Sequence, residues 1–242
     1  MFEAGGLISV LIIAAMGGFI QRVTGFGFGI FVMLFFPYIM KTHTSAAAIS
    51  ALISCCISIC NAIKYRKNTP YKQIIPLVLA ALITIPVAVR FSVLVSGDFF
   101  RKALGTVLIA LSIYLMFFNS RIKVKPTVKN GLIAGGIGGI LSGLFSTGGP
   151  PIVLYLMNAF SDNVLYFAST QFYFGLTELY STVVRIFNGI IDTEVIVYSI
   201  IGFAGSIAGN FVGSRVFDKL QPDKLRRLIN ICMIISGVIM IF

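Results

Sequence analysis

The chain has 242 residues, of which 57% are hydrophobic and 11% are charged, and its mean hydropathy of +0.97 excludes a soluble globular domain. The formal net charge of +11 does not indicate nucleic-acid binding, because the basic residues stand in short loops between apolar runs. The composition predicts an integral protein of the lipid bilayer with little mass outside it.

Apolar runs separated by polar or glycine-rich residues predict ten membrane segments in two sets of five. In the first half these runs cover 5–20, 25–40, 44–63, 74–95 and 103–118. In the second half they cover 131–145, 150–160, 164–186, 195–212 and 225–242. We therefore divide the chain into a first repeat at 1–120, a basic cytoplasmic linker at 121–130 and a second repeat at 131–242.

Equivalent residues in the two halves support an internal duplication, which apolar composition alone would not. At one constant spacing, Ala14, Gly18 and Gly27 fall on Gly135, Gly139 and Gly148. At a second, 88–90 falls on 213–215, and each stretch ends in an arginine. Glycines recur at every fourth position, which predicts ridges of close helix packing; they are Gly131, Gly135, Gly139 and Gly143, and Gly205, Gly209 and Gly213.

The basic residues fall mainly in three loops, which the positive-inside rule places in the cytoplasm. They are Lys64, Arg66, Lys67 and Lys72; Arg121, Lys123, Lys125 and Lys129; and Arg215, Lys219, Lys224, Arg226 and Arg227. The three loops lie on the same side of the membrane only if the first two segments of each half form a hairpin that returns to the side from which it entered. Each of these segments is about 24 Å long or less, which suits such a hairpin. This predicts an all-α membrane fold of two inverted repeats, each with a hairpin of two short helices followed by three membrane helices, and with both termini outside.

Two breaks interrupt the apolar runs at matching places, at 25–29 and at 146–151. Broken backbone within a membrane is tolerated only where protein or a water-filled cavity satisfies it. Pro150 and Pro151 suit the first turn of a new helix, Ser146 or Thr147 suits its N-cap, and a helix N-terminus favours an anion. We predict a small-anion site at the two breaks, formed by Arg22, Thr24, Gly25, Phe26, Gly27, Phe28, Ser146, Thr147, Gly148 and Gly149.

At these breaks the sequence resembles the sulfite exporter TauE/SafE family of membrane transporters, of the toluene sulfonate uptake permease type. The run 25–29 with Pro37 after it, and the run 147–156, look like that family's two repeated signatures. The likeness in size and duplication covers essentially the whole chain. It implies a bacterial or archaeal plasma-membrane carrier for small sulfur-containing anions such as sulfite, thiosulfate, organosulfonates or sulfoacetate.

Further polar residues within the predicted membrane segments each have two interpretations. Arg22 contributes either to the anion site or to an ion pair or helix cap. Glu178 is either a proton carrier or the structural partner of Arg22 or Arg185. Three other residues either line the same cavity or form interhelical hydrogen bonds; they are Asn61, Gln171 and Tyr173.

The leading hypothesis is a secondary transporter that moves its anion by alternating access, with a proton or another ion as the coupling partner. The alternative is an anion channel whose filter lies at the same breaks. An intramembrane enzyme is not expected, since the sequence offers no His/Glu metal cluster, paired aspartates or Ser/His dyad at membrane depth. We expect no metal or cofactor, and a monomer or homodimer. The cysteines, Cys55, Cys56, Cys60 and Cys232, have no metal or disulfide spacing.

Overall fold

The computed structural model describes residues 4–117, 125–216, 231, 234–235 and 237–241, and over these residues the protein is helical without strands. The helices are α1 (Ala4–Thr24), α2 (Phe28–Val32), α3 (Phe36–Ile39), α4 (His43–Lys64), the 3₁₀ turn η1 (Arg66–Asn68), α5 (Tyr71–Leu94), α6 (Gly97–Phe117), α7 (Val128–Phe145), α8 (Gly149–Ala159), α9 (Asn163–Phe187) and α10 (Thr193–Val216). The predicted segment at 225–242 lies largely outside the described residues, and so does the first part of the linker, at 121–124.

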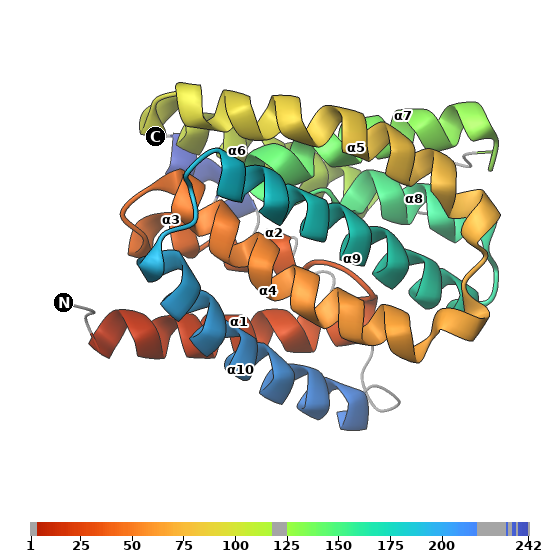
Figure 1. Cartoon of the computed structure of the whole chain (residues 1–242), viewed down its shortest axis with the longest axis horizontal. Helices are drawn as coiled ribbons and strands as arrows, with labels where there is room; N and C mark the ends of the chain where they lie inside the picture. The colour runs from red at the N-terminus through yellow and green to blue at the C-terminus, as the bar shows by residue number, and fades with distance from the viewer. Residues whose placement is uncertain (1–3, 118–124, 217–230, 232–233, 236, 242) are drawn as a thin grey trace.

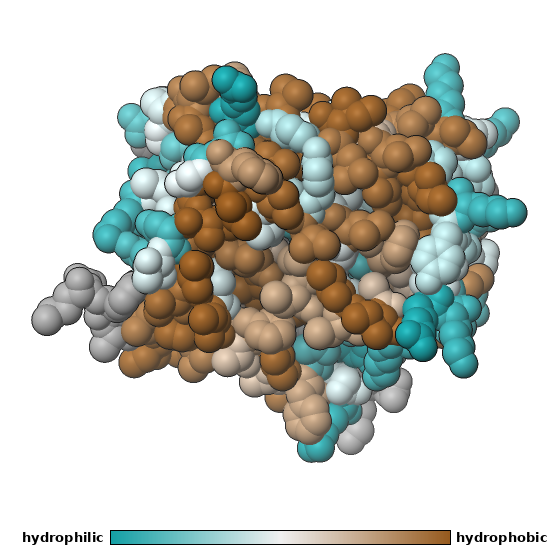
Figure 2. All heavy atoms as spheres, viewed as in Figure 1, coloured by the Kyte–Doolittle hydropathy of each residue, from teal (hydrophilic) through white to brown (hydrophobic). Residues whose placement is uncertain are grey.

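Five of these helices are long and apolar enough to cross a membrane, namely α1, α4, α5, α7 and α10. Large apolar side chains on α5 are exposed at the surface, with Ile83, Val87 and Leu94 more than 70% accessible. Figure 2 shows hydrophobic residues over the middle of the molecule and hydrophilic ones gathered toward its two ends. A surface of this kind is stable in lipid and not in water, so the protein is a multi-pass membrane protein.

Side-chain caps explain where several of the long helices begin. Thr42 accepts a hydrogen bond from the N–H of Ser45 at the start of α4, and Thr127 does the same for α7. Asp162 accepts from the second and third residues of α9, and Asp192 accepts from Val195 of α10. A short oxygen-bearing side chain satisfies N–H groups that have no partner within the helix, and these residues therefore fix the first turns.

The helices of the two halves interlock in a reciprocal way. The most extensive packing joins α1 to α10, α5 to α7, and α4 to α9. Figure 1 shows α4 and α9 side by side and running in opposite directions, and α1 and α7 also run opposite ways. In the predicted repeat, α1 corresponds to α7, α4 to α9 and α5 to α10, so exchanging the two halves gives the same three helix pairs, as inverted repeats require. The repeat itself stays a prediction.

The predicted glycine ridges lie where helices approach most closely. A methyl group built on Gly135 would lie 2.1 Å from the carbonyl oxygen of Leu77 on α5. One built on Gly209 would lie 1.8 Å from the carbonyl oxygen of Ala15 on α1. Only hydrogen fits at these positions, and the prediction of close packing at both ridges is confirmed.

The first hairpin differs from the predicted one in two ways. The segment predicted at 5–20 extends to Thr24, so α1 has 21 residues and is itself long enough to cross the membrane. The segment predicted at 25–40 is divided into α2 and α3. Pro37 lacks the N–H that would continue a helix through Met33, and the chain turns there instead. The first segment of each half is thus longer than expected, and the segment after it is short.

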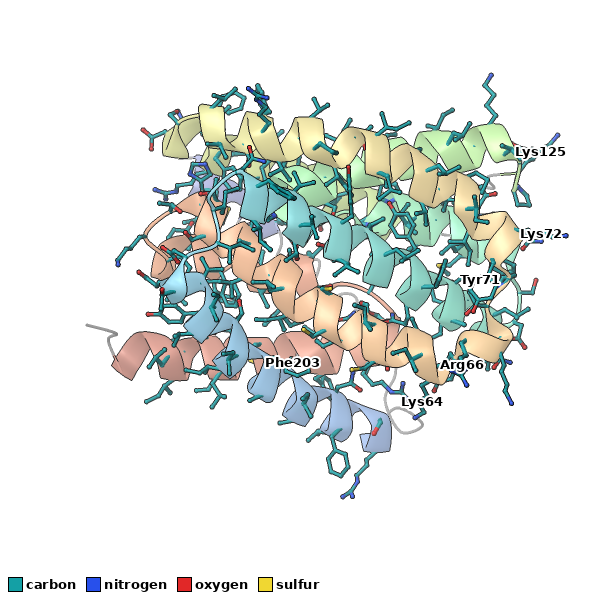
Figure 3. All side chains as sticks on the ribbon, viewed as in Figure 1. Lys64, Arg66, Tyr71, Lys72, Lys125 and Phe203 are labelled. Carbon is teal, nitrogen blue, oxygen red and sulfur yellow. The ribbon has the colours of Figure 1, made fainter. Side chains whose placement is uncertain are left out.

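Basic side chains gather at one end of the bundle. Figure 3 labels Lys64, Arg66, Lys72 and Lys125, which lie together at the end where α4 finishes and where α5 and α7 begin. At the opposite end, an exposed ion pair joins Lys41, before α4, to Glu194 in the first turn of α10. The Glu194 carboxylate accepts a hydrogen bond from Lys41 and thereby raises the pKa of that lysine. Two segments distant in the chain are therefore connected at that end.

Candidate functional site

The two breaks meet in the middle of the bundle. A methyl group built on Gly29 would lie 1.8 Å from the carbonyl oxygen of Ser146, and one built on Gly149 would lie 3.2 Å from the ring of Phe26. Each break therefore contacts the other through backbone that carries no Cβ at the closest point. Residues more than a hundred positions apart come together here, as the sequence predicts.

Local hydrogen bonds fix the shape of the first break. Gly25 and Gly27 have positive φ angles of 82° and 95°, which glycine adopts at low cost. The Thr24 hydroxyl lies 2.9 Å from the carbonyl oxygen of Ile20 and 2.5 Å from that of Phe26. Thr24 therefore closes the turn after α1 with its side chain.

A side chain from the other half also holds this break. The side-chain amide of Gln171 on α9 donates to the carbonyl oxygen of Gly25 at 2.9 Å. Asn61 on α4 in turn donates to the Gln171 side-chain oxygen at 3.2 Å. Of the two predicted roles of Gln171 and Asn61, the structure thus shows interhelical hydrogen bonding.

The second break leaves two hydroxyls without a capping role. Ser146 has a φ of 55°, and its N–H bonds to the carbonyl oxygen of Ser142, so it ends α7 in the left-handed conformation. The N-cap of α8 is Gly148, with no side-chain hydrogen bond to that helix start. The prediction that Ser146 or Thr147 caps α8 is therefore wrong, because the left-handed turn at Ser146 places the helix start one or two residues later.

A small cavity lies between the breaks and is lined by both. Its free volume is about 20 Å³, which is room for one or two water molecules. The lining residues come from α1, the two breaks, α2, α4, α8 and α9; they are Gln21, Phe26, Gly27, Phe28, Gly29, Ile30, Ser54, Ser146, Thr147, Gly148, Gly149, Phe174 and Glu178.

Polar atoms in this cavity have no partner within the described part of the chain. They are Oε1 of Gln21, Oγ of Ser146, Oγ1 of Thr147 and Oε2 of Glu178, and each of these residues is at most 5% exposed. Most buried polar atoms in proteins are hydrogen-bonded, and an unpaired one costs about 1–3 kcal/mol. Four of them around one small space indicate that the cavity takes a polar occupant.

Glu178 is held at the cavity wall by a serine. The Ser142 hydroxyl donates to its Oε1, while Oε2 is buried and has no hydrogen-bond partner among the described residues. Arg185, fully buried two turns further along α9, donates to the carbonyl oxygen of Gly143 at 2.8 Å and to the Ser181 hydroxyl at 3.3 Å. Among the described side chains neither Arg22 nor Arg185 forms a direct ion pair with Glu178. The interpretation of Glu178 as half of such a pair is not supported.

Comparison with known proteins decides the class of protein. The sequence profile of the sulfite exporter TauE/SafE family matches residues 10–240. The chain belongs to this family. It is 24% identical over 230 residues to the probable sulfite/organosulfonate exporter TauE of Cupriavidus necator, covering 92% of the present chain and 88% of that protein. No solved structure matches it. This TauE/SafE protein is therefore a membrane transporter by family.

Most of the predicted site residues of this TauE/SafE protein line the cavity, but Arg22 does not. Arg22 is half-buried beside the ring of Phe167, 5.4 Å from its centroid, and lines a different cavity together with Asn61. Helical geometry is the reason, since consecutive residues on α1 point about 100° apart, and Gln21 faces inward instead.

Thr24, Gly25 and Tyr173 also stand outside the cavity wall. The first two shape the break, whereas Tyr173 is buried with its hydroxyl close to Gly138.

Sequence reasoning left out five residues that line the cavity in this TauE/SafE protein. They are Gln21, Gly29, Ile30, Ser54 and Phe174. Gln21 carried a usable signal, because a glutamine inside an apolar run directly before a break is unusual. The other four resemble ordinary packing residues, and only their place against the breaks distinguishes them.

Proposed function

We propose that the protein carries a small sulfur-containing oxyanion across the plasma membrane and binds it in the cavity between the two breaks. Four unpartnered buried polar atoms around that cavity are the observation that carries this proposal. The ligand class is sulfite, thiosulfate, an organosulfonate or sulfoacetate. The name of the Cupriavidus relative, an exporter of sulfite and organosulfonates, supports this class.

The cavity offers neutral donors to the anion. The hydroxyls of Ser146 and Thr147 can rotate to donate, and the N-terminus of α8 adds a positive dipole from Gly149 onward. Within the described part of the chain, no lysine or arginine lines the cavity. Neutral donors bind an anion less tightly than a cation would, which suits a carrier that must also release its cargo.

The size of the cavity supports a carrier over a channel. A space of about 20 Å³ cannot hold a sulfonate, so the breaks must separate before the anion enters. We propose that the halves move relative to each other as inverted repeats and expose the site to each side in turn. The end with the basic loops faces the cytoplasm in this proposal.

A screen by thermal unfolding tests the substrate class directly. A ligand that binds only the folded protein raises its stability by mass action. We expect sulfite, thiosulfate, sulfoacetate or taurine to raise the unfolding temperature of the purified protein more than chloride or acetate does. Equal shifts with carboxylates and sulfonates would contradict the proposed class.

Thr147→Val is expected to weaken anion binding about tenfold or more while it leaves stability unchanged or slightly higher. The substitution removes a hydrogen bond to the anion but also removes a buried hydroxyl that has no partner in the described structure. Binding is measured as the ligand-dependent shift in unfolding temperature, and flux in liposomes.

Thr182→Val is the matched control, because Thr182 on α9 carries another buried hydroxyl without a partner among the described residues, and it does not line the cavity. It should keep normal binding. Normal flux in Thr147→Val would refute the site, and equal losses in both variants would show a structural effect.

Glu178 is expected to make binding depend on pH, because it lines the site and one of its carboxylate oxygens has no partner among the described residues. A charged carboxylate repels an anion, whereas a protonated one donates a hydrogen bond, so proton and anion favour each other's binding. The titratable groups that face Glu178 are Arg185 and Tyr173 on α9 and Cys55 on α4. We propose that Glu178 couples transport to a proton.

Glu178→Gln is expected to bind the anion with the same affinity at all pH values, whereas wild type should bind it more tightly as pH falls. A pH gradient should drive sulfonate uptake into liposomes for wild type and not for the variant. Retained pH-dependence in Glu178→Gln would assign the coupling proton to another group.

A further inference from the structure

A second cavity of about 290 Å³ lies between α1, α4 and α10. Its walls include Arg22, Cys60, Asn61, Lys64, Phe203 and Ile207. Figure 3 labels Lys64 and Phe203, which belong to α4 and α10, and α4 and α10 spread apart toward the end that carries the basic side chains (Figure 1). This cavity, called the vestibule below, has room for a small organic anion, whereas the central cavity does not.

The vestibule follows the central cavity along both α1 and α4. On α1, Gln21 lines the central cavity and its neighbour Arg22 lines the vestibule. On α4, Ser54 lines the central cavity, while Cys60 and Lys64 line the vestibule. Because α4 ends at the basic end of the bundle, the vestibule lies between that end and the two breaks.

Few hydrogen bonds stand between the two cavities. Asn61, in the vestibule wall, donates to Gln171, which donates to the carbonyl oxygen of Gly25 in the first break. Gln21 also donates to the hydroxyl of Ser58 on α4 at 3.3 Å. These bonds link the vestibule wall to the first break.

The charges of the vestibule favour an anion. Arg22 and Lys64 both line it, and among the residues that the structure describes no acidic one does. Neither cation forms an ion pair with any side chain in the described ranges. Arg22 is half-buried against the aromatic ring of Phe167. A partly desolvated guanidinium without a carboxylate gains free energy from a bound oxyanion, which it can hold with two parallel hydrogen bonds.

We propose that the vestibule is a second binding site, where Arg22 and Lys64 hold a sulfonate before it passes to the central cavity or after it leaves. This inference rests on the proposed function and extends it to a second position of the same anion. Phe203 and Ile207 would contact the carbon part of an organosulfonate. The headgroup of an anionic phospholipid has the same chemistry and is the competing occupant.

Cys60 provides a direct measurement, since it is exposed and lies in the vestibule wall. We would replace Cys56 and Cys232 by alanine, leave the buried Cys55, and follow the reaction of Cys60 with a charged, membrane-impermeant maleimide in liposomes of phosphatidylcholine. The probe ligand is methanesulfonate, because sulfonates do not react with maleimide as sulfite does.

Methanesulfonate is expected to slow the labelling of Cys60 in a saturable way. Arg22→Gln combined with Lys64→Gln should weaken this protection about tenfold or more. Arg66→Gln combined with Lys67→Gln removes the same charge from the exposed turn η1 and should leave the protection unchanged.

Flux of methanesulfonate through the same protein separates this inference from the proposed function. Flux without protection of Cys60 would overturn the proposal that the vestibule binds the anion, and the proposal of the central site would stand. Protection without flux would support the vestibule as an anion site and refute the carrier. If adding phosphatidylglycerol alone blocked labelling and methanesulfonate never did, a lipid would be the occupant and the proposal would fail.

Discussion

Gly29→Ala is expected to abolish anion flux in liposomes, because the new Cβ would lie 1.8 Å from the carbonyl oxygen of Ser146. The position of the new Cβ is fixed by the backbone of residue 29, and the oxygen belongs to the backbone of Ser146. No side-chain rotation can therefore relieve the overlap, and the two breaks must move apart. Overpacking of this kind costs about 1–3 kcal/mol and here also displaces the residues that line the cavity. The measurement is flux per folded protein, with folding followed by thermal unfolding.

Two glycine substitutions serve as controls for this result. Gly136→Ala adds a methyl group 3.9 Å from the nearest atom, on Thr84, and should be neutral or stabilise α7 by about 0.5–1 kcal/mol. Gly209→Ala creates an equally short contact with Ala15, away from the cavity. It should lower stability while its folded fraction still transports. Normal flux in Gly29→Ala would show that the contact between the breaks is not needed.

Arg185→Leu is expected to destabilise the protein by about 1–3 kcal/mol for each buried acceptor that loses its donor. The substitution removes the buried donors to the carbonyl oxygen of Gly143 and to the Ser181 hydroxyl. It also leaves the Glu178 carboxylate buried without the cation that lies on the same helix. Thermal or denaturant unfolding in detergent measures this loss.

A double-mutant cycle tells which of these two effects dominates. In the Arg185→Leu background, Glu178→Gln should recover part of the lost stability, because it removes the charge left without compensation. If the two substitutions were simply additive, Arg185 would act only by holding the end of α7. The contribution of Arg185 to the free energy of unfolding would then be independent of the Glu178 carboxylate.

The sequence by itself was sufficient for several features that have a local cause, although it misplaced the N-cap of α8 and missed the division of the segment at 25–40. Glycine and proline break helices through their own backbone chemistry, so the breaks at 25–29 and 146–151 could be located without a structure. Apolar composition identified a membrane protein, and the paired signatures identified the family. Glycines repeated at every fourth position marked the tight ridges because a helix brings them onto one face.

Tertiary structure alone decided which side chains face the cavity. Gln21 and Arg22 are neighbours in the chain, yet one lines the central cavity and the other the vestibule. Helices such as α1, α7 and α10 are apolar on all sides, so hydrophobic periodicity does not show which face points inward. Packing against a partner helix sets that rotation, and the contact of Gly29 with Ser146 arises only when both halves are in place.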